Sequence, residues 1–394
     1  MLKNNALIFY YHRINSYSFN ALAGAIDADT ELTEIPVGIA LTVNDLHEHI
    51  SEALRNHSRV ITAFSIMTCQ FDEASQLIRK LRGEYDGRLI ILAGGPHATA
   101  RPEDVLRMGP DIVFRGEAET SFPRVLKALF RGMNCAAIQS ADTQTDLDQT
   151  FSFSPKRGMF GPIEITRGCA FACRFCQTSH IFGARLRHRS VEKIVRQAES
   201  LCSINRKVVR LLSPNAFSYG SPDGRKLNLD AVRDLLAALR ESLSADGRII
   251  FAHFPSEARP EHITPETLSL LDEFADNDEI VIGAQSGSQR MLDVCDRAHT
   301  VNDVISAVAC ARKHGYKIIV DFMFGLPGEN DTDRRENLSV MKEIVSMGAR
   351  IHPHIFSPLP QTAFANEPSG DISPFFFDIL NEFRSRMAIY EHLG

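Results

Sequence analysis

Short apolar runs alternate with amphipathic helical patterns along most of the chain, and this alternation limits the folds that it can adopt. The first run, 6–11, is continuously apolar, which is typical of a strand buried on both faces of a sheet. A second strand is expected at 32–37, and helical patterns cover 18–28, 44–56 and 71–81. Strands that alternate with helices form parallel sheets covered by helices. The sequence therefore predicts an α/β protein.

Polar and glycine-rich segments follow three of the strands expected in the first third of the chain. They occupy 65–68, 94–99 and 115–120, where the strands end. The carboxyl ends of parallel strands share one edge of a sheet, and ligands bind there, near the point where the strand order reverses. Glycine allows the backbone to approach a ligand closely. We therefore expect a ligand site at this edge.

The second part of the chain repeats the alternation of strand and helix six times. The predicted strands are 163–166, 208–212, 249–253, 280–284, 317–322 and 351–356. Six units are too few for the complete eight-stranded barrel. Residues 136–161 are mostly polar and read as a linker between the two parts, and 361–394 read as a C-terminal extension.

Three cysteines lie together at the end of the first of these six strands. Cys169, Cys173 and Cys176 have the spacing C-x3-C-x2-C, with Phe175 between the last two. Thiolate sulfur is the usual protein ligand of an iron–sulfur cluster. Three cysteines leave one iron of a four-iron cluster free to bind a substrate. A structural zinc site is the alternative; it needs four ligands, of which His180 could be one, and no second C-x-x-C pair is present.

The cysteine spacing together with Phe175 resembles the signature of the radical S-adenosylmethionine superfamily. The resemblance implies a [4Fe-4S] cluster on the three cysteines, an open iron that chelates S-adenosylmethionine, and packing of Phe175 near the adenine. It also implies a partial (β/α)6 barrel of the TIM type over 162–360. The segments IGAQSGS and DFMFGLPGE are similar to barrel segments of the cobalamin-associated branch. By that similarity, further S-adenosylmethionine contacts are expected at Ser256, Glu257, Gln285 and Ser286.

Residues 1–135 resemble the cobalamin-binding domain that precedes many radical S-adenosylmethionine enzymes. The AGGPHAT loop at 93–99 and the RGEAET loop at 115–120 carry the resemblance, which implies a doubly wound, Rossmann-like domain. The cobalamin contacts that it implies are Ser65, Thr68, Gly94, Gly95, His97, Gly116, Glu117, Glu119 and Thr120. The motif Asp-x-His-x-x-Gly is absent after the first strand, so we expect no protein histidine on cobalt. A domain that has kept the fold but binds nothing is the alternative.

His352 and His354 alternate on the last predicted strand and therefore share one face. Two interpretations stay open for this pair, contact with a substrate or a purely structural role. No residue is assigned a catalytic role from the sequence.

Composition and charge narrow the class of protein. With 44% hydrophobic and 23% charged residues, the composition is that of a globular protein. The net charge of −6 argues against sequence-independent nucleic-acid binding, which usually needs a basic patch. No apolar run approaches the length of a membrane span, and the N-terminus lacks a signal-peptide layout. We expect a cytoplasmic protein with neither nucleic acid nor membrane as a partner, and its eight cysteines do not predict a disulfide framework.

The resemblance implies a cobalamin-dependent C-methyltransferase that moves a methyl group from methylcobalamin to an unactivated sp3 carbon. The acceptor is a small molecule, a protein or a peptide, and a side chain of methyl-coenzyme M reductase is one candidate. The cluster requires an electron donor such as ferredoxin or flavodoxin, and the chemistry requires anaerobic conditions. Two alternatives are a cobalamin-dependent rearrangement or cyclisation without methyl transfer, and an iron–sulfur electron-transfer or sensor protein.

Overall fold

The computed structural model describes residues 4–85, 87–141, 144–370, 377, 381–384 and 388–390. The chain divides into two compact units, Met1–Gly161 and Pro162–Gly394, and each unit has its own parallel strands and buried core. Of the predicted C-terminal extension, 361–394, the structure describes only 361–370, 377, 381–384 and 388–390. Among the described residues, no helix combines the length and the apolar character needed to cross a membrane.

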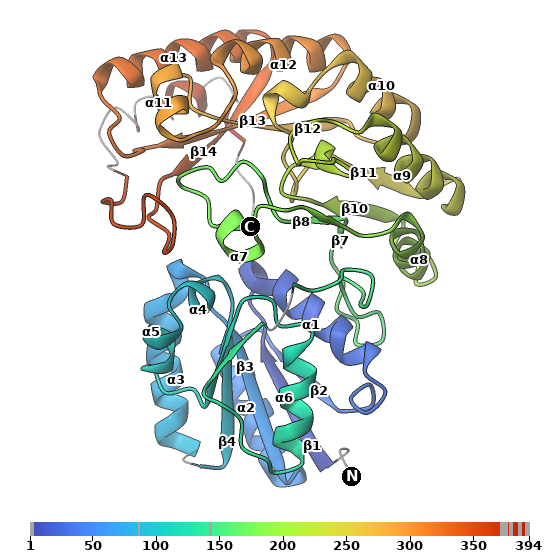
Figure 1. The fold of residues 1–394 in the computed structure, drawn as a ribbon, viewed down its shortest axis with the longest axis vertical. Helices are drawn as coiled ribbons and strands as arrows, with labels where there is room; N and C mark the ends of the chain where they lie inside the picture. The colour runs from blue at the N-terminus through green and yellow to red at the C-terminus, as the bar shows by residue number, and fades with distance from the viewer. Residues whose placement is uncertain are drawn as a thin grey trace. The chain divides into compact units, whose positions relative to one another are not determined.

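The first unit is built around one parallel sheet of six strands, in the order β2-β1-β3-β4-β5-β6 (Figure 1). Its strands are β1 (Asn5–Tyr10), β2 (Val37–Ala40), β3 (Arg59–Ser65), β4 (Leu89–Gly94), β5 (Ile112–Arg115) and β6 (Ile138–Ser140). The chain passes from β1 to β2 on one side and then to β3 on the other, so the strand order reverses at β1. The doubly wound fold predicted from the sequence is confirmed.

Two pairs of helices cover the two faces of this sheet. One pair is α1 (Ser16–Ala28) and α6 (Ser121–Phe130), and the other is α2 (Val43–Asn56) and α3 (Phe71–Tyr85). Leu7 and Phe9 of β1 pack with the first pair, and Ile8 packs with the second. Because successive side chains of a strand point to opposite faces, a strand covered on both faces must be apolar throughout. This explains the continuous apolar run at 6–11.

The second strand of this sheet lies later in the chain than the sequence predicts. The prediction placed it at 32–37, but β2 is Val37–Ala40. The amide of Thr33 donates to the carbonyl of Asp29, and that of Ile35 to the carbonyl of Leu32, so this segment forms turns. Leu32 and Ile35 are buried all the same, which explains why their apolar character imitated a strand.

The segment predicted as a linker, 136–161, packs as part of the first unit. Its strand β6 pairs with β5 and extends the sheet by one strand. Farther on, the Arg157 guanidinium donates to the carboxylate of Asp27 at 2.8 Å and to the carbonyl of Ile35 at 2.9 Å. These contacts hold the segment on the unit, and Leu147, Phe153 and Met159 are buried, so it is not a free connector.

The second unit contains six parallel strands in two groups of three, β11-β10-β7 and β12-β13-β14. They are β7 (Ile163–Glu164), β10 (Val208–Leu212), β11 (Arg248–Ile250), β12 (Glu279–Gln285), β13 (Lys317–Phe324) and β14 (Ala349–Ile355). A parallel bridge between Ala258 and Ile282 joins the segment after β11 to β12. This is the partial six-stranded barrel that the sequence predicts.

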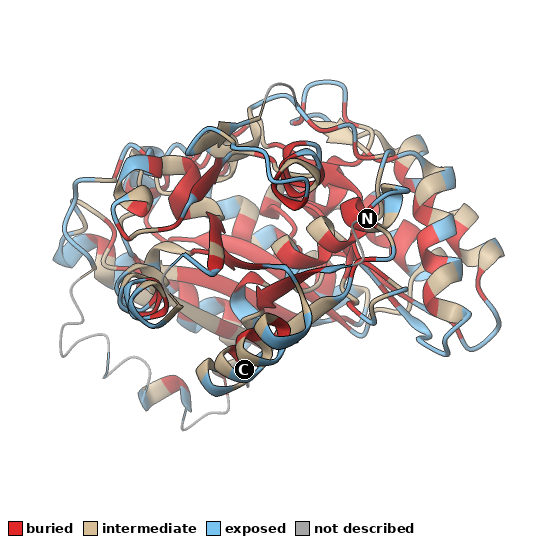
Figure 2. Cartoon of the chain, turned by 90° about the horizontal axis from the view of Figure 1, so that it is seen from below, coloured by how far each residue is buried: buried red, intermediate tan, exposed pale blue. Residues whose placement is uncertain are grey.

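Helices alternate with these strands and cover the outside of the barrel (Figure 1). They are α8 (Val191–Cys202), α9 (Leu229–Ser242), α10 (Pro265–Phe274), α11 (Gln289–Val294), α12 (Val301–Lys313) and α13 (Asp331–Ser346). Thr300 caps α12, because its hydroxyl accepts a hydrogen bond from the amide of Asp303. The carboxylate of Asp303 in turn accepts a hydrogen bond from the amide of Thr300. Figure 2 shows that the buried residues are concentrated on the strands and on the inward faces of the helices.

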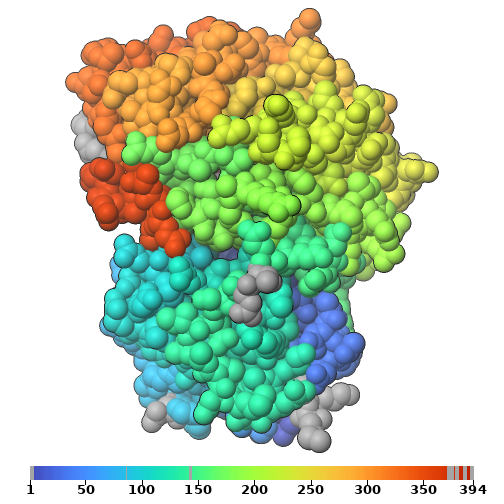
Figure 3. Space-filling model, in the orientation of Figure 1, coloured from blue at the N-terminus to red at the C-terminus, as the bar shows by residue number. Residues whose placement is uncertain are grey.

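Three shorter helices stand near the strand ends. They are α4 (Pro96–Ala100) and α5 (Pro102–Leu106) in the first unit and α7 (Thr178–Phe182) in the second. The stretch that directly follows β14 is seen in red-orange at the edge of the second unit in the space-filling view (Figure 3). The last described residues return to β14, since Ile389 forms a parallel bridge with Ile351.

Candidate active site

The loop that carries the three cysteines begins at the end of the short strand β8 (Thr166–Arg167), directly after β7. Gly168 has a φ of +95°, and a Cβ atom there would lie 2.5 Å from the carbonyl oxygen of Arg185. Ala172 also has a positive φ, of 50°, which is uncommon for a residue with a side chain. The backbone therefore turns twice within the loop, and glycine is required at the first turn.

The three thiols of this loop lie near one another. Burial raises the pKa of Cys176, and the charges of Cys173 and Cys169 raise it further. The amide of Cys176 donates to the carbonyl of Cys173 at 2.9 Å, which closes the turn between them. All three cysteines are free, so each can offer a thiolate to a metal.

The spread of these thiols fits a cluster better than a single ion. In the described part of the chain, the one group of three metal-ligating side chains whose ligand atoms all lie within 4.8 Å of one another does not include the cysteines. A single zinc ion binds sulfur at about 2.3 Å, which places neighbouring sulfurs about 3.8 Å apart. A four-iron cluster holds its cysteines farther apart than that. The residues present therefore fit a [4Fe-4S] cluster with three protein ligands.

A buried arginine links the cysteine loop to the barrel. The Arg297 guanidinium donates to the sulfur of Cys173 at 3.5 Å and to the carbonyl of Gly283 on β12 at 2.6 Å. Burial lowers the pKa of Arg297, but the charges of Cys173 and Glu257 raise it more, and the net direction is upward. Burial beside Cys173 raises the pKa of Cys295 to about 12, so this fourth nearby cysteine stays a neutral thiol.

Two of the predicted S-adenosylmethionine contacts meet inside the barrel. The side-chain amide of Gln285 donates to the Glu257 carboxylate at 3.3 Å. The pairing register between β12 and β13 shifts at Gly283 and Gln285, and Gln285 has a φ of 70°. Such a bulge redirects a side chain, and here it brings Gln285 to Glu257. At Gly283 a Cβ atom would collide with the Glu257 carboxylate, so glycine gives that carboxylate its room.

Glu257 is a buried carboxyl group with a perturbed pKa. Burial raises the pKa of Glu257 to about 8, and the charge of Asp321 on β13 contributes to the rise. The guanidinium groups of Arg297 and Arg259 act in the opposite direction. A perturbed carboxyl group with specific charged partners at the strand ends of a barrel is typical of a functional site.

Two other predicted contacts are engaged with the protein itself. The hydroxyl of Ser256 donates to the carbonyl of Leu211 and accepts from the amide of Ser213. The hydroxyl of Ser286 donates to the side chain of Asn337 at 3.0 Å. These bonds hold the loops after β11 and β12 in place. For both serines, contact with S-adenosylmethionine stays a prediction, and their side chains already position the strand ends.

Phe175 stands at the rim of an apolar cluster next to the cysteines. The buried members of this cluster are Met291, Cys295, Leu326, Phe356 and Phe364. Phe175 itself is only partly buried against them, so part of its ring is available to a ligand. Its predicted contact with adenine stays a prediction.

The sequence analysis did not single out Arg297 or Asp321. Asp321 lies inside a strand that is otherwise apolar, and a charged residue in such a run is a usable signal. Arg297 follows α11 in a short loop without a recognisable pattern. Only the fold brings it to Cys173, from which it is separated by 124 positions.

The candidate cobalamin edge of the first unit has a close turn at Gly95. Gly95 has a φ of +98°, and a Cβ atom there would lie 2.6 Å from the amide nitrogen of Ile66 and 2.9 Å from the hydroxyl of Ser65. The carbonyl of the preceding Gly94 accepts from the amide of Ile66 at 2.8 Å. The ends of β3 and β4 therefore touch at this point, and a side chain would push them apart.

Three polar side chains gather at this turn. The Nδ1 atom of His97 lies 3.1 Å from the hydroxyl of Thr68. The Nε2 atom of His97 and the hydroxyl of Ser65 are buried and have no hydrogen-bond partner among the residues that the structure describes. Burial lowers the pKa of His97, so the imidazole is neutral near pH 7. Buried polar atoms are normally paired, and two that are left over at a glycine turn fit the polar groups of a bound cofactor.

The remaining predicted cobalamin contacts follow β5. Gly116 has a φ of +84° and starts this loop. The carboxylate of Glu117 accepts from the amide of Thr145 at 3.2 Å, and that of Glu119 accepts from its hydroxyl at 3.4 Å. Thr120 precedes α6, and its side chain makes no capping bond. The residues at the ends of β3, β4 and β5 fit cobalamin, and their contacts with it stay predictions.

Comparison with known proteins assigns both units. The model of the radical SAM superfamily matches residues 163–341, and that of the B12 binding domain matches residues 14–126. A relative named tRNA-2-methylthio-N(6)-dimethylallyladenosine synthase, from Geobacter metallireducens, is 29% identical over 73% of this chain. The present chain spans 64% of the length of that relative.

Solved structures share the fold over nearly the whole chain. The radical S-adenosylmethionine methyltransferase TsrM from Kitasatospora setae, with cobalamin and a [4Fe-4S] cluster bound, has a TM-score of 0.67 at 16% identity, and the match covers 93% of this chain and 77% of TsrM. The cobalamin-dependent S-adenosylmethionine radical enzyme OxsB has a TM-score of 0.68 at 15% identity, with 99% of this chain and 62% of OxsB covered.

The two domains together imply three cofactors, a [4Fe-4S] cluster, S-adenosylmethionine and cobalamin. The geometry of the cysteine loop fits the first, and the glycine turn with its unpartnered buried atoms fits the third. These findings favour a radical S-adenosylmethionine enzyme over the two alternatives, a structural zinc site and an iron–sulfur electron carrier. The chain therefore carries a B12 binding domain followed by a domain of the radical SAM superfamily.

Proposed function

We propose that this protein is a cobalamin-dependent radical S-adenosylmethionine C-methyltransferase that acts on an unactivated sp3 carbon. The observation that carries the proposal is the chain of contacts from Cys173 through Arg297 to Glu257, within a chain that also has a B12 binding domain. When bound, the cluster with S-adenosylmethionine supplies a carbon-centred radical for hydrogen abstraction, and cobalamin supplies the methyl carrier.

The residues of the barrel are suited to bind and orient S-adenosylmethionine. Glu257 and Gln285 offer a carboxyl group and an amide at the strand ends, and both can hold hydroxyl or amino groups of a ligand. Arg297 places a fixed positive charge beside the sulfur of Cys173, where it would balance part of the negative charge of a bound cluster. Phe175 offers a partly exposed ring beside the loop for stacking.

Burial of these groups also protects the site from water. Gln285 and Arg297 are buried and Glu257 is half-buried, so the ligand that they hold would be largely desolvated. Exclusion of water strengthens the electrostatic contacts and prevents side reactions of a reactive intermediate. The protein thus positions its ligands and isolates them, while the cofactors supply the difficult bond-making steps.

The acceptor is the open part of this proposal. A small molecule, a protein or a peptide all remain candidates, and a side chain of methyl-coenzyme M reductase is the protein candidate that the sequence suggests. The relative from Geobacter metallireducens is named for a product on tRNA, so tRNA is the fourth class to test. An electron donor of the ferredoxin or flavodoxin type would reduce the cluster.

The test is anaerobic reconstitution of the protein with iron, sulfide and cobalamin, followed by incubation with dithionite and S-adenosylmethionine that carries a trideuterated methyl group. Each acceptor class is analysed by mass spectrometry. We expect 5′-deoxyadenosine, S-adenosylhomocysteine and an acceptor that carries the labelled methyl group. Formation of 5′-deoxyadenosine with an altered but unlabelled product would instead establish a rearrangement or cyclisation and refute methyl transfer.

A further inference from the structure

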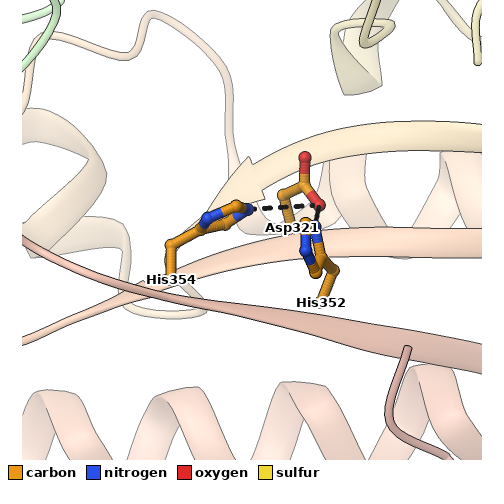
Figure 4. Close-up of side chains that lie close together, drawn as sticks. All are labelled: Asp321, His352 and His354. Carbon is orange, nitrogen blue, oxygen red and sulfur yellow. Dashed lines mark hydrogen bonds and ion pairs between the residues drawn. The ribbon is translucent and has the colours of Figure 1, made fainter. Parts of the chain in front are cut away.

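Three metal-ligating side chains converge on the wall of the barrel, apart from the cysteine loop (Figure 4). They are Asp321, His352 and His354. Asp321 of β13 is the register partner of His352 on β14, and His354 lies two residues farther along the same strand. Alternate residues of a strand share one face, so both imidazoles reach the same carboxylate. The pairing of two neighbouring strands therefore builds this group.

The distances in this group match those between ligands of one ion. The Oδ1 atom of Asp321 lies 2.8 Å from Nδ1 of His352 and 3.6 Å from Nε2 of His354. The ligand atoms all lie within 4.8 Å of one another. A first-row divalent ion binds nitrogen and oxygen at about 2.0–2.2 Å, which places neighbouring ligand atoms about 3–3.5 Å apart. Only small side-chain adjustments would be needed to place such an ion.

A second observation concerns the charge of this group. The Asp321 side chain is 0% exposed, and its Oδ2 atom has no hydrogen-bond partner among the described residues. The carboxyl group of Glu257 faces Asp321, and the charge of Asp321 contributes to the raised pKa of Glu257. A buried carboxylate is costly unless it is paired or coordinates a metal. A cation bound at Asp321 would offset this charge.

Aromatic rings surround His352, the hydrogen-bond partner of Asp321. The rings of Phe254 and Tyr390 pack against His352, with centroids 5.1 Å and 5.5 Å away. These rings fix the orientation of that imidazole. The His354 side chain is 40% exposed and the His352 side chain 16%, so a solvated ion can reach the group.

We propose that Asp321, His352 and His354 bind one divalent transition-metal ion, of the class of Zn²⁺ or Fe²⁺. Two imidazoles and one carboxylate are a common ligand set for such ions. Three protein ligands leave at least one coordination position open, and such an open position is typical of a catalytic site rather than a structural one. An external oxygen donor, such as a carboxylate or hydroxyl group of a substrate, would fit that position.

Zinc binding to the reconstituted full-length protein tests this proposal without any knowledge of the acceptor. Zinc and iron are measured separately per chain by plasma mass spectrometry after equilibrium dialysis, so the iron of the cluster does not interfere. We expect one zinc equivalent that His354→Ala and Asp321→Asn each weaken at least tenfold. Because His354 is partly exposed, its truncation should leave the fold intact, and circular dichroism checks both variants.

The matched control is His314→Ala. His314 and Asp272 form another hydrogen-bonded pair in the same unit, at 2.7 Å, but without a second histidine. We expect this variant to bind zinc as the parent does. Equal zinc binding in the parent, His354→Ala and His314→Ala would refute the site and leave a hydrogen-bonded network only.

Anomalous X-ray scattering at the zinc edge gives an independent readout. Crystals of the reconstituted protein soaked in zinc should show a peak between Asp321, His352 and His354. Zinc peaks confined to other parts of the molecule would overturn the proposal. Neither measurement depends on methyl transfer, so failure of the metal site and failure of the proposed activity can be told apart.

Discussion

The carboxyl edges of the two sets of strands are built in the same way but differ in charge. In both units the strands of the main sheets are parallel, and the segments after them carry the polar groups. At the ends of β3 and β4 in the first unit these groups are neutral, namely the hydroxyls of Ser65 and Thr68 and the uncharged imidazole of His97, while the carboxylates of Glu117 and Glu119 follow β5. At the edge of the second unit Arg297 and Glu257 lie among other buried charges.

This difference predicts how each edge responds to mutation. A buried charge is stable only with its partner, and removal of one member leaves the other uncompensated. A neutral hydroxyl costs much less to remove. Loss of one group at the second edge should therefore strongly reduce stability or activity. Loss of one group at the first edge should reduce the affinity for cobalamin by a small amount.

The largest effect is expected from Cys173→Ala. This cysteine is both a predicted cluster ligand and the partner of Arg297, so its loss should remove the cluster and with it all formation of 5′-deoxyadenosine. Iron analysis and the visible absorption of the reconstituted protein measure the loss. Cobalamin binding should be unaffected, because the cobalamin contacts are predicted in the first unit.

Cys202→Ser is the matched control for this prediction. Cys202 ends α8 and has no role in the loop, so the variant should keep the full iron content. If Cys173→Ala kept a complete cluster, the assignment of its three ligands would be wrong.

Arg297→Met should destabilise the second unit by about 3 kcal/mol, because it leaves the buried carbonyl of Gly283 without its charged hydrogen-bond donor. Urea unfolding followed by circular dichroism measures the effect. Arg233→Met is the control, since Arg233 and Glu273 form an exposed pair and its loss should change the free energy of unfolding by about 0.5 kcal/mol or less. Equal effects in the two variants would show that Arg297 does not organise this edge.

The charged edge also shows which parts of the site a sequence can reveal. The three cysteines can be proposed as cluster ligands because their spacing lies within one loop. The strand–helix alternation could be predicted because its period is local. Arg297 and Asp321 could not, since their partners are fixed by strand register across the barrel. His352 and His354 were recognised as sharing a face, but their common partner was not.

In the first unit, a local feature of the candidate site was predicted from the sequence, but the position of one strand was not. Its glycine turn at Gly95 was predicted from the strand-end pattern alone. The position of β2 was not, because Leu32 and Ile35 are buried in turns and so carry the same apolar signal as a strand. Burial and backbone conformation are separate properties, and a short apolar run reports only the first.

Gly95→Ala should have the largest effect at the neutral edge. The positive φ costs an alanine about 1 kcal/mol, and the contact with the amide of Ile66 adds to this cost, so we expect a loss of about 2–3 kcal/mol of stability. Cobalamin affinity, measured by the absorption change on titration, should fall at least tenfold. Gly109→Ala separates the two causes, because Gly109 has a φ of +107° but nothing within 4 Å of an added Cβ atom. The control should lose stability by about 1 kcal/mol and keep its affinity.

The neutral imidazole of His97 should make the first unit sensitive to acid. Burial lowers the pKa of His97 in the folded state, whereas the unfolded chain takes up a proton near pH 6.5. Below that pH the unfolded state binds more protons, so the free energy of unfolding should fall by up to about 1.4 kcal/mol per pH unit until the folded-state pKa is reached. His97→Gln should reduce this slope in urea unfolding between pH 7 and 5. An unchanged slope would place the acid sensitivity on other groups.

The smallest effect should come from Ser65→Ala. The Ser65 hydroxyl is buried without a partner among the described residues, so its removal should leave the stability of the cofactor-free protein unchanged or slightly higher. If the hydroxyl binds cobalamin, the affinity should fall about fivefold, which corresponds to one neutral hydrogen bond of about 1 kcal/mol. Thr62→Val is the matched control, because Thr62 also carries a buried, unpartnered hydroxyl but lies within β3 rather than at its end. Equal affinities in the two variants would mean that the hydroxyl of Ser65 does not bind cobalamin. The neutral edge would then recognise cobalamin by shape alone, whereas the second edge depends on charged groups.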